Sequence, residues 1–136
     1  MNSIKLGRLV FGVMYLFAAV VHLLLAIFNP TAYSGLGESA LLPFYKDLFT
    51  SVVPVYAVTF ALTLAIVELL MAGLILSKGV FAKTGFVLSV LFQILLAPLG
   101  WWGFCNVILA VVQVLWLKEP FAYSVFSEPT RQPTAS

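Results

Sequence analysis

The feature that most constrains this chain is the run Val53–Leu76, which is 24 residues long, largely apolar, and holds a single carboxyl group, Glu68. About 20 apolar residues in a helix cross a bilayer core of about 30 Å, so the run predicts a membrane span. A charge near the centre of such a span costs about 2.5–3.5 kcal/mol. Glu68 is therefore expected to face protein, with the other helices packed around it.

The composition extends this expectation to the whole chain. Of 136 residues, 62% are hydrophobic and 9% are charged, whereas soluble domains carry about 25% charged residues. We therefore expect an integral membrane protein of one domain. The net charge of +2 is small and dispersed, which argues against a nucleic-acid partner. Cys105 is the only cysteine, which excludes an intrachain disulfide and a CxxC pair. Its side chain is expected to be a small buried hydrophobe. No metal-ligand spacing is evident.

Apolar runs and their proline and glycine breaks predict an all-α, four-helix membrane bundle over residues 1–120. The expected spans are 9–28, 53–76, 80–99 and 103–117. The first begins like a signal peptide, but its long apolar run and the lack of a small-x-small site favour an uncleaved helix. The aromatic-rich segment 29–52 is expected to form an outward lid or a short interfacial helix. Residues 121–136 are expected to be a frayed cytoplasmic tail.

Basic residues predict the orientation of these spans. Six of them fall on one side, namely Lys5, Arg8, Lys78, Lys83, Lys118 and Arg131, and only Lys46 falls on the other. Basic residues in short loops favour the cytoplasmic side. Both termini are therefore expected inside, with segment 29–52 and Trp101-Trp102 outside, in a multi-pass plasma-membrane protein.

Each span carries small and polar residues at helical spacing, which predicts packing seams between helices. They are Tyr15, His22, Ala26 and Asn29 in the first span, Ala61, Ala65, Glu68 and Ala72 in the second, Gly85, Ser89, Gln93, Ala97 and Gly100 in the third, and Asn106, Ala110 and Gln113 in the fourth. Close packing between helices is enough to explain the small residues. The polar members Glu68, His22, Tyr15, Gln93, Asn106 and Gln113, together with Arg8, are candidate groups for a ligand or a proton.

Depth along the helices separates these candidates, at about 1.5 Å per residue. His22, Gln93 and Asn106 fall in the outer third, and Glu68 lies nearer the middle with Tyr15, Ser89 and Gln113. His22 and Glu68 are therefore expected to be two layers of one polar column and not a direct pair.

The protonation state of Glu68 remains open, and both Glu68 and His22 could have either a structural or a functional role. Desolvation favours a neutral carboxyl group, and a neutral Glu68 could donate to Gln113 or Ser89. A charged Glu68 would need Arg8, a lysine at the cytoplasmic ends, or a bound cation. Intramembrane carboxylates favour a functional role over a structural one, while His22 is equally compatible with a structural role and with a ligand or proton role.

Two stretches resemble the DoxX-like family of small four-helix membrane proteins. One is Leu6-Gly-Arg8-Leu-Val-Phe-Gly12, followed by an aliphatic span that ends near a histidine. The other is Glu68-Leu-Leu-Met-Ala-Gly73-Leu-Ile-Leu, with Lys78 or Lys83 before the next span. Together they cover about the first 85 residues. The resemblance implies the four-span fold and, as for some members, a subunit linked to thiosulfate and quinone redox chemistry.

Three functions follow as hypotheses. The first is an accessory protein or subunit of a quinone-linked membrane redox system, with a redox-enzyme subunit or a second copy as partner. The chain has no cofactor-ligand set of its own, so electrons would come from that partner or the quinone, and the protein is not expected to be an enzyme alone. The second is a small transporter or a protein that binds lipid or another hydrophobic ligand, with Glu68 as its coupling group. The third is a scaffold without chemistry.

Overall fold

The computed structural model describes residues 3–127, and within them all regular structure is helical. The long helices are α1 (Ser3–Phe28), α4 (Ala57–Leu76), α5 (Gly79–Leu96) and α6 (Gly103–Trp116). Between α1 and α4 lie η1 (Pro30–Tyr33), α2 (Ser34–Ser39), α3 (Pro43–Asp47) and the π-helical turn η2 (Leu48–Val52). A short 3-10 turn, η3 (Ala97–Leu99), extends α5.

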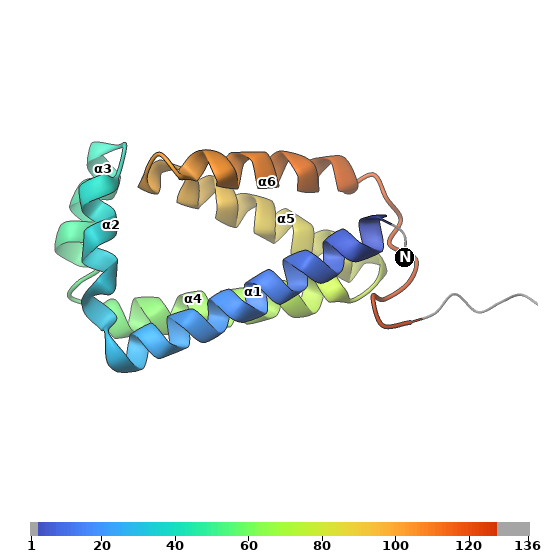
Figure 1. Ribbon diagram of the computed structural model, residues 1–136, viewed down its shortest axis with the longest axis horizontal. Helices are drawn as coiled ribbons and strands as arrows, with labels where there is room; N and C mark the ends of the chain where they lie inside the picture. The colour runs from blue at the N-terminus through green and yellow to red at the C-terminus, as the bar shows by residue number, and fades with distance from the viewer. Residues whose placement is uncertain (1–2, 128–136) are drawn as a thin grey trace, which may run out of the picture.

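The long helices form two arms that meet at one end (Figure 1). Helix α1 packs along α4, α4 packs on α5, and α5 packs on α6. The arms converge where the chain begins and diverge toward the other end, where α2 and α3 stand across them. We call residues 29–56 the cap, and we call the opposite end, with the start of α1 and residues 117–127, the terminal end.

Three of the helical segments are long and apolar enough to cross a membrane, which indicates a membrane protein. They are α1, α4 and the continuous segment Gly79–Leu99. Helix α6 is apolar but has 14 residues, which corresponds to about 21 Å of helix.

The helices match the expected spans closely, with two shifts. Helix α1 begins at Ser3, six residues before the expected start, and α4 begins at Ala57, four residues after it. The second shift lies at Pro54, which has no N–H to donate and so separates the turn η2 from α4. Residues 53–56 instead form turns in which the N–H groups of Val55 and Tyr56 donate to the carbonyls of Val52 and Val53.

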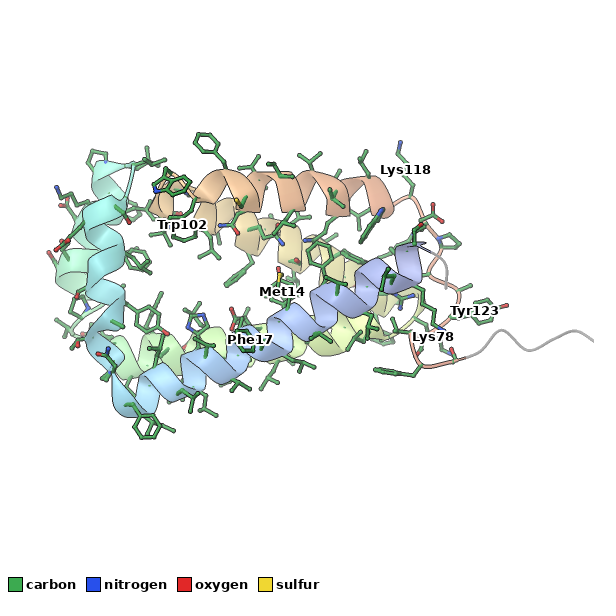
Figure 2. All side chains as sticks on the ribbon, in the orientation of Figure 1. Met14, Phe17, Lys78, Trp102, Lys118 and Tyr123 are labelled. Carbon is green, nitrogen blue, oxygen red and sulfur yellow. The ribbon has the colours of Figure 1, made fainter. Side chains whose placement is uncertain are left out.

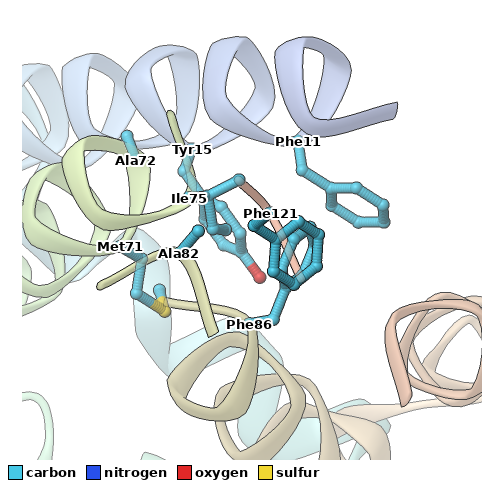
Figure 3. Packing of buried hydrophobic residues seen from close by; sticks show 8 residues of the cluster. All are labelled: Phe11, Tyr15, Met71, Ala72, Ile75, Ala82, Phe86 and Phe121. Carbon is cyan, nitrogen blue, oxygen red and sulfur yellow. The ribbon is translucent and has the colours of Figure 1, made fainter. Parts of the chain in front are cut away.

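A cluster of buried aromatic and aliphatic side chains holds the terminal end together (Figure 3). Phe11, Phe86 and Phe121 come from α1, α5 and the segment after α6. Trp116 of α6 meets the edges of Phe11 and Phe86, with ring centroids 5.9 and 6.0 Å apart. Edge-to-face ring pairs stabilise by about 0.5–1.5 kcal/mol beyond their burial. This cluster joins the two arms where α1 and α6 are otherwise separate helices.

The segment after α6 is folded, so the expected frayed tail was wrong for residues 121–127. Phe121 and Val125 are buried. The Phe121 carbonyl accepts from Gly79 N–H at 2.8 Å, and Val125 N–H donates to the Leu76 carbonyl at 3.2 Å. The segment therefore covers the turn between α4 and α5. The remainder of the predicted tail, including Arg131, lies outside the described residues.

Arg8 is a buried cation whose hydrogen bonds connect α1 to the end of α4 and to the segment after α6. Its side chain is 4% exposed. Nε donates to the Ile75 carbonyl at 3.1 Å, one Nη donates to the Tyr123 carbonyl at 2.9 Å, and the other Nη donates to the Ser77 carbonyl. The last carbonyls of a helix have no partner within it and carry partial negative charge. Arg8 thus caps the C-terminus of α4.

The cap bridges the two arms at the other end. It packs against α1 and α4 through Tyr33, Phe49 and Val53. It reaches the second arm through three hydrogen bonds, Leu41 N–H to the Pro98 carbonyl (2.8 Å), Ser39 Oγ to the Leu99 carbonyl (2.9 Å) and Tyr45 OH to the Leu95 carbonyl (2.9 Å). The short helices expected in this segment are confirmed.

The predicted seams are largely confirmed by burial, with Asn29 as the error, and the separate expectation for Cys105 is wrong. All four seam residues of α4 are buried, and Gly85 lets α5 approach α4, since a Cβ there would lie 2.7 Å from Ile75 N. Asn29, expected on the α1 seam, is exposed because the chain turns into η1 at that point. Cys105, expected to be buried, is also exposed. Its neighbours Phe104 and Ile108 on α6 are exposed as well.

Candidate functional site

Three side chains from three elements form a chain of polar contacts near the cap, one an ion pair and one a hydrogen bond. His22 of α1 lies between Glu68 of α4 and Tyr33 of η1. Its Nε2 is 3.3 Å from Glu68 Oε1, and its Nδ1 is 2.5 Å from the Tyr33 hydroxyl oxygen. The imidazole also stacks on the Tyr33 ring, with centroids 5.6 Å apart. The residues are thus connected in the order Glu68, His22, Tyr33.

The prediction that His22 and Glu68 are not directly paired was wrong. Part of the reason is the late start of α4, which places Glu68 closer to the cap end than a span from Val53 implied. The rest follows from side-chain direction, because helical side chains tilt toward the N-terminus of their own helix. Helices α1 and α4 are antiparallel neighbours, so His22 leans away from the cap while Glu68 leans toward it.

His22 and Tyr33 form part of the wall of a cavity of about 170 Å³ under the cap. Its other walls are apolar and come from both arms and the cap: Leu36, Phe49, Phe60, Leu64, Phe92, Leu96, Leu99 and Trp102. Figure 2 places Trp102 at this end, near the base of α6. The cavity therefore presents aromatic and aliphatic surface with one polar corner.

Glu68 is 3% exposed and lies behind His22, outside the cavity wall. Its Oε1 faces His22, while Oε2 is buried without a hydrogen-bond partner. The expected donation to Gln113 or Ser89 is not present among the hydrogen bonds of residues 3–127, and Arg8 is engaged at the terminal end. His22 therefore connects Glu68 to the cavity wall.

A second polar cluster lies between α1 and α5. The Tyr15 hydroxyl is 2.5 Å from Ser89 Oγ, and Gln93 Nε2 donates to the Tyr15 hydroxyl at 3.1 Å. Tyr15 also interacts electrostatically with Glu68. The predicted candidates Tyr15 and Gln93 are thus brought together, next to the Glu68 pair.

Of the two candidates of α6, Gln113 is buried and Asn106 is half-buried, and both are isolated. Gln113 is 0% exposed, and neither of its amide atoms has a partner. Asn106 Nδ2 and Gln93 Oε1 also lack partners. A buried polar group without a hydrogen bond costs about 1–3 kcal/mol. These amides lie outside the His22 chain and outside the cavity wall.

Tyr33 is the site residue that sequence reasoning missed. It is 4% exposed although it belongs to the connection after α1. The available signal was an aromatic hydroxyl in the first turn after the helix that carries the only histidine. Burial, and secondarily the charge of Glu68, raise the pKa of Tyr33 to about 12. The phenol therefore keeps its proton at neutral pH and can take part in hydrogen bonds as donor or acceptor.

A larger cavity of about 600 Å³ lies at the terminal end, lined by Lys5, Arg8 and residues 119–124 with Ser127. Its cations are already engaged, Arg8 with three carbonyls and Lys5 with the Ser127 carbonyl at 3.3 Å. We place the candidate site at the cap because an acid and a base meet there. Within residues 3–127, no three His, Cys, Asp or Glu side chains gather as metal ligands would.

Comparison with protein-family models, with curated protein sequences and with solved structures finds no match to this chain. The chemistry of the site therefore rests on its own geometry. A small apolar cavity with one polar corner is typical of sites that bind apolar ligands and fix their orientation through a few hydrogen bonds.

Proposed function

We propose that this protein is a multi-pass membrane protein that binds one ring of a hydrophobic ligand in the cavity under the cap. The observation that carries the proposal is the cavity itself, whose apolar wall is interrupted by His22 and Tyr33. A cavity of about 150 Å³ lined by apolar side chains holds a benzene molecule. The cavity of about 170 Å³ is partly open, so it suits a single six-membered ring whose substituents extend through the opening.

A quinone head group is the occupant that we favour. It is a single flat ring, it stacks on aromatic side chains, and its carbonyl oxygens accept hydrogen bonds of the kind that a tyrosine hydroxyl donates. The resemblance to the DoxX-like family supports the same choice. On this proposal the protein is an accessory or subunit of a quinone-linked membrane redox system, and a partner subunit supplies the electrons.

The alternative is a protein that binds or transports a hydrophobic ligand without redox chemistry. The same cavity supports it, because nothing in an apolar wall requires the ring to be a quinone. The two functions share the site and differ in the ligand that accompanies the protein from its native membrane. Organic extraction of the purified protein, followed by mass spectrometry, separates them.

Filling the cavity should abolish ring binding. Leu64 lines the cavity, whereas Leu62 lies on the exposed face of the same helix, so Leu64→Trp and Leu62→Trp form a matched pair. We expect calorimetry in detergent to detect duroquinone (tetramethylbenzoquinone) binding to the parent and to Leu62→Trp. Leu64→Trp should bind at least about tenfold more weakly, because a ring and the new indole compete for one volume. Equal heats for all three proteins would indicate micelle partitioning and contradict the site.

For the membrane arrangement we propose four spans with both termini cytoplasmic. Lys78 and Lys118 lie at the terminal end (Figure 2), with Lys5, Arg8 and Lys83 on the adjoining ends of α1 and α5, while Lys46 lies in the cap. The positive-inside rule then favours a cytoplasmic terminal end. Helix α6 is the short fourth span, and it begins directly after the aromatic pair Trp101-Trp102.

Cysteine labelling tests this orientation. In whole cells, on a Cys105→Ser background, an impermeant maleimide should label Glu38→Cys in the cap and should not label Lys78→Cys at the terminal end. Both positions are exposed, so accessibility depends on the side of the membrane. Labelling of position 78 with protection of position 38 would invert the arrangement.

A further inference from the structure

The Glu68–His22–Tyr33 chain reaches the cavity through the Tyr33 hydroxyl. Both imidazole nitrogens of His22 are occupied, Nε2 by Glu68 and Nδ1 by Tyr33. The phenol oxygen of Tyr33 has one O–H and two lone pairs, and His22 engages only one of these. Tyr33 lines the cavity, so within this chain the remaining donor or acceptor of Tyr33 is the one that a bound ligand could use.

Whether the His22–Glu68 pair carries one extra proton decides whether Tyr33 offers the cavity a hydrogen-bond donor or an acceptor. When the pair carries its extra proton, His22 Nδ1 bears a hydrogen and donates to the Tyr33 oxygen, and the Tyr33 O–H is left for the ligand. When that proton is lost, His22 keeps its hydrogen on Nε2, where the Glu68 carboxylate accepts it. Nδ1 then accepts from Tyr33, and only lone pairs of Tyr33 face the cavity.

We infer that the Glu68–His22–Tyr33 chain is a switch that selects between ring ligands carrying a hydrogen-bond acceptor and ring ligands carrying a donor, according to whether the pair holds a proton. This inference rests on the proposed ring site and adds its regulation. A quinone offers only acceptors, whereas its reduced form offers hydroxyl donors. The protonated pair therefore favours the oxidised ring, and loss of the proton favours the reduced ring.

The groups around the His22–Glu68 pair indicate that the proton is gained or lost by this pair. The titratable groups that face it are Tyr33 from η1 and Tyr15 from α1, both of which interact with the Glu68 charge. The other described residues of the cavity wall, contributed by α2, η2, α4, α5, η3 and Trp102, are uncharged. The raised pKa of Tyr33, about 12, means that its own proton stays in place while the pair gains or loses one.

Linkage turns the switch into a measurable proton uptake. If duroquinone binds only the protonated pair, its binding takes up a proton, and its affinity falls by about tenfold per pH unit once the free pair has lost that proton. Durene, the same methylated ring without oxygens, should bind independently of pH. Anaerobic durohydroquinone should retain its affinity at high pH. Calorimetry in buffers of different ionisation enthalpy, from about pH 5 to about pH 9, measures both affinity and proton uptake.

Tyr33→Phe tests the assigned contact, because it keeps the ring and removes the hydroxyl. Durene binding should persist, which reports an intact cavity, while the preference for duroquinone over durene should fall by about tenfold and the proton uptake should vanish. Tyr45→Phe is the matched control. It removes a cap hydroxyl that bonds to the Leu95 carbonyl, outside the cavity wall, and should keep both effects.

The outcomes separate this inference from the proposed function. Equal affinity of the parent for duroquinone and durene at every pH, without proton uptake, would overturn the switch and leave the ring site intact. The same would hold if Tyr33→Phe kept the full pH dependence. Failure of both rings to bind the parent would overturn the site and the switch together.

Discussion

Replacing Arg8 with methionine is expected to destabilise the folded protein by about 3–5 kcal/mol. The substitution removes the donors of three carbonyl groups, those of Ile75, Ser77 and Tyr123. An acceptor left without a donor costs about 1–3 kcal/mol when it is buried, as at Ile75, and less when it is part-buried, as at Ser77 and Tyr123. The loss also removes a cation placed 5.2 Å from the centroid of the Phe121 ring, a contact of about 0.5–2 kcal/mol.

Thermal unfolding followed by circular dichroism in detergent measures this effect. Lys5→Met is the control, since Lys5 lies on the same helix and makes one exposed hydrogen bond at 3.3 Å; a change within about 0.5 kcal/mol is expected. Arg8→Lys should recover only part of the loss, because an ammonium group lacks the planar fork that meets three carbonyls. If Arg8→Met unfolds at the same temperature as Lys5→Met, the hydrogen bonds of Arg8 do not stabilise the terminal end.

The second large effect is expected at Gly103, the first residue of α6. A Cβ at this position would lie 1.9 Å from the Ala97 carbonyl oxygen. The obstacle is backbone, so relief requires η3 and α6 to move apart, and overpacking of this kind costs about 1–3 kcal/mol or more. Because Trp102 and Leu99 flank this junction and line the cavity, Gly103→Ala should also weaken ring binding.

Gly73→Ala should stabilise the protein in the same unfolding experiment, whereas Gly103→Ala should destabilise it. Gly73 lies within α4, and a Cβ there meets nothing within 4 Å. Alanine is the better helix former by about 0.8–1.0 kcal/mol, so Gly73→Ala should raise the unfolding temperature. A Gly103→Ala variant that unfolds as high as Gly73→Ala would show that η3 and α6 are not held in the close contact described.

The sequence predicts those parts of the fold that depend on hydrophobicity and helical spacing. The run around Glu68 places Ala61, Ala65 and Ala72 on one face, and all are buried. Helix α6 ends within one residue of its expected boundary. Segments with many apolar residues but a proline near the boundary are harder, as Pro54 demonstrates, because the same composition suits a helix or the turn before it.

The site was less predictable because it depends on how elements are placed in three dimensions. Glu68 and His22 were recognised from their chemistry, but their contact results from antiparallel helices whose side chains lean toward each other. Tyr33 joins them only because η1 folds back over the end of α1. The burial of Phe121 was likewise not evident, since an aromatic residue in a proline-containing polar segment has no periodic pattern to place it.

The cap is attached unequally to the two arms, and this has a kinetic consequence. It continues α1 and α4 through the chain itself, whereas three hydrogen bonds, from Ser39, Leu41 and Tyr45, and packing around Leu99 join it to the second arm. At about 0.5–1.5 kcal/mol each, these bonds alone would leave the contact between cap and second arm open in about one molecule in ten to one in two thousand. The packing around Leu99 lowers that fraction further. Exchange through this contact would then be timed by the joint loss of the bonds and the packing, and an occupant's residence would be set separately from its affinity.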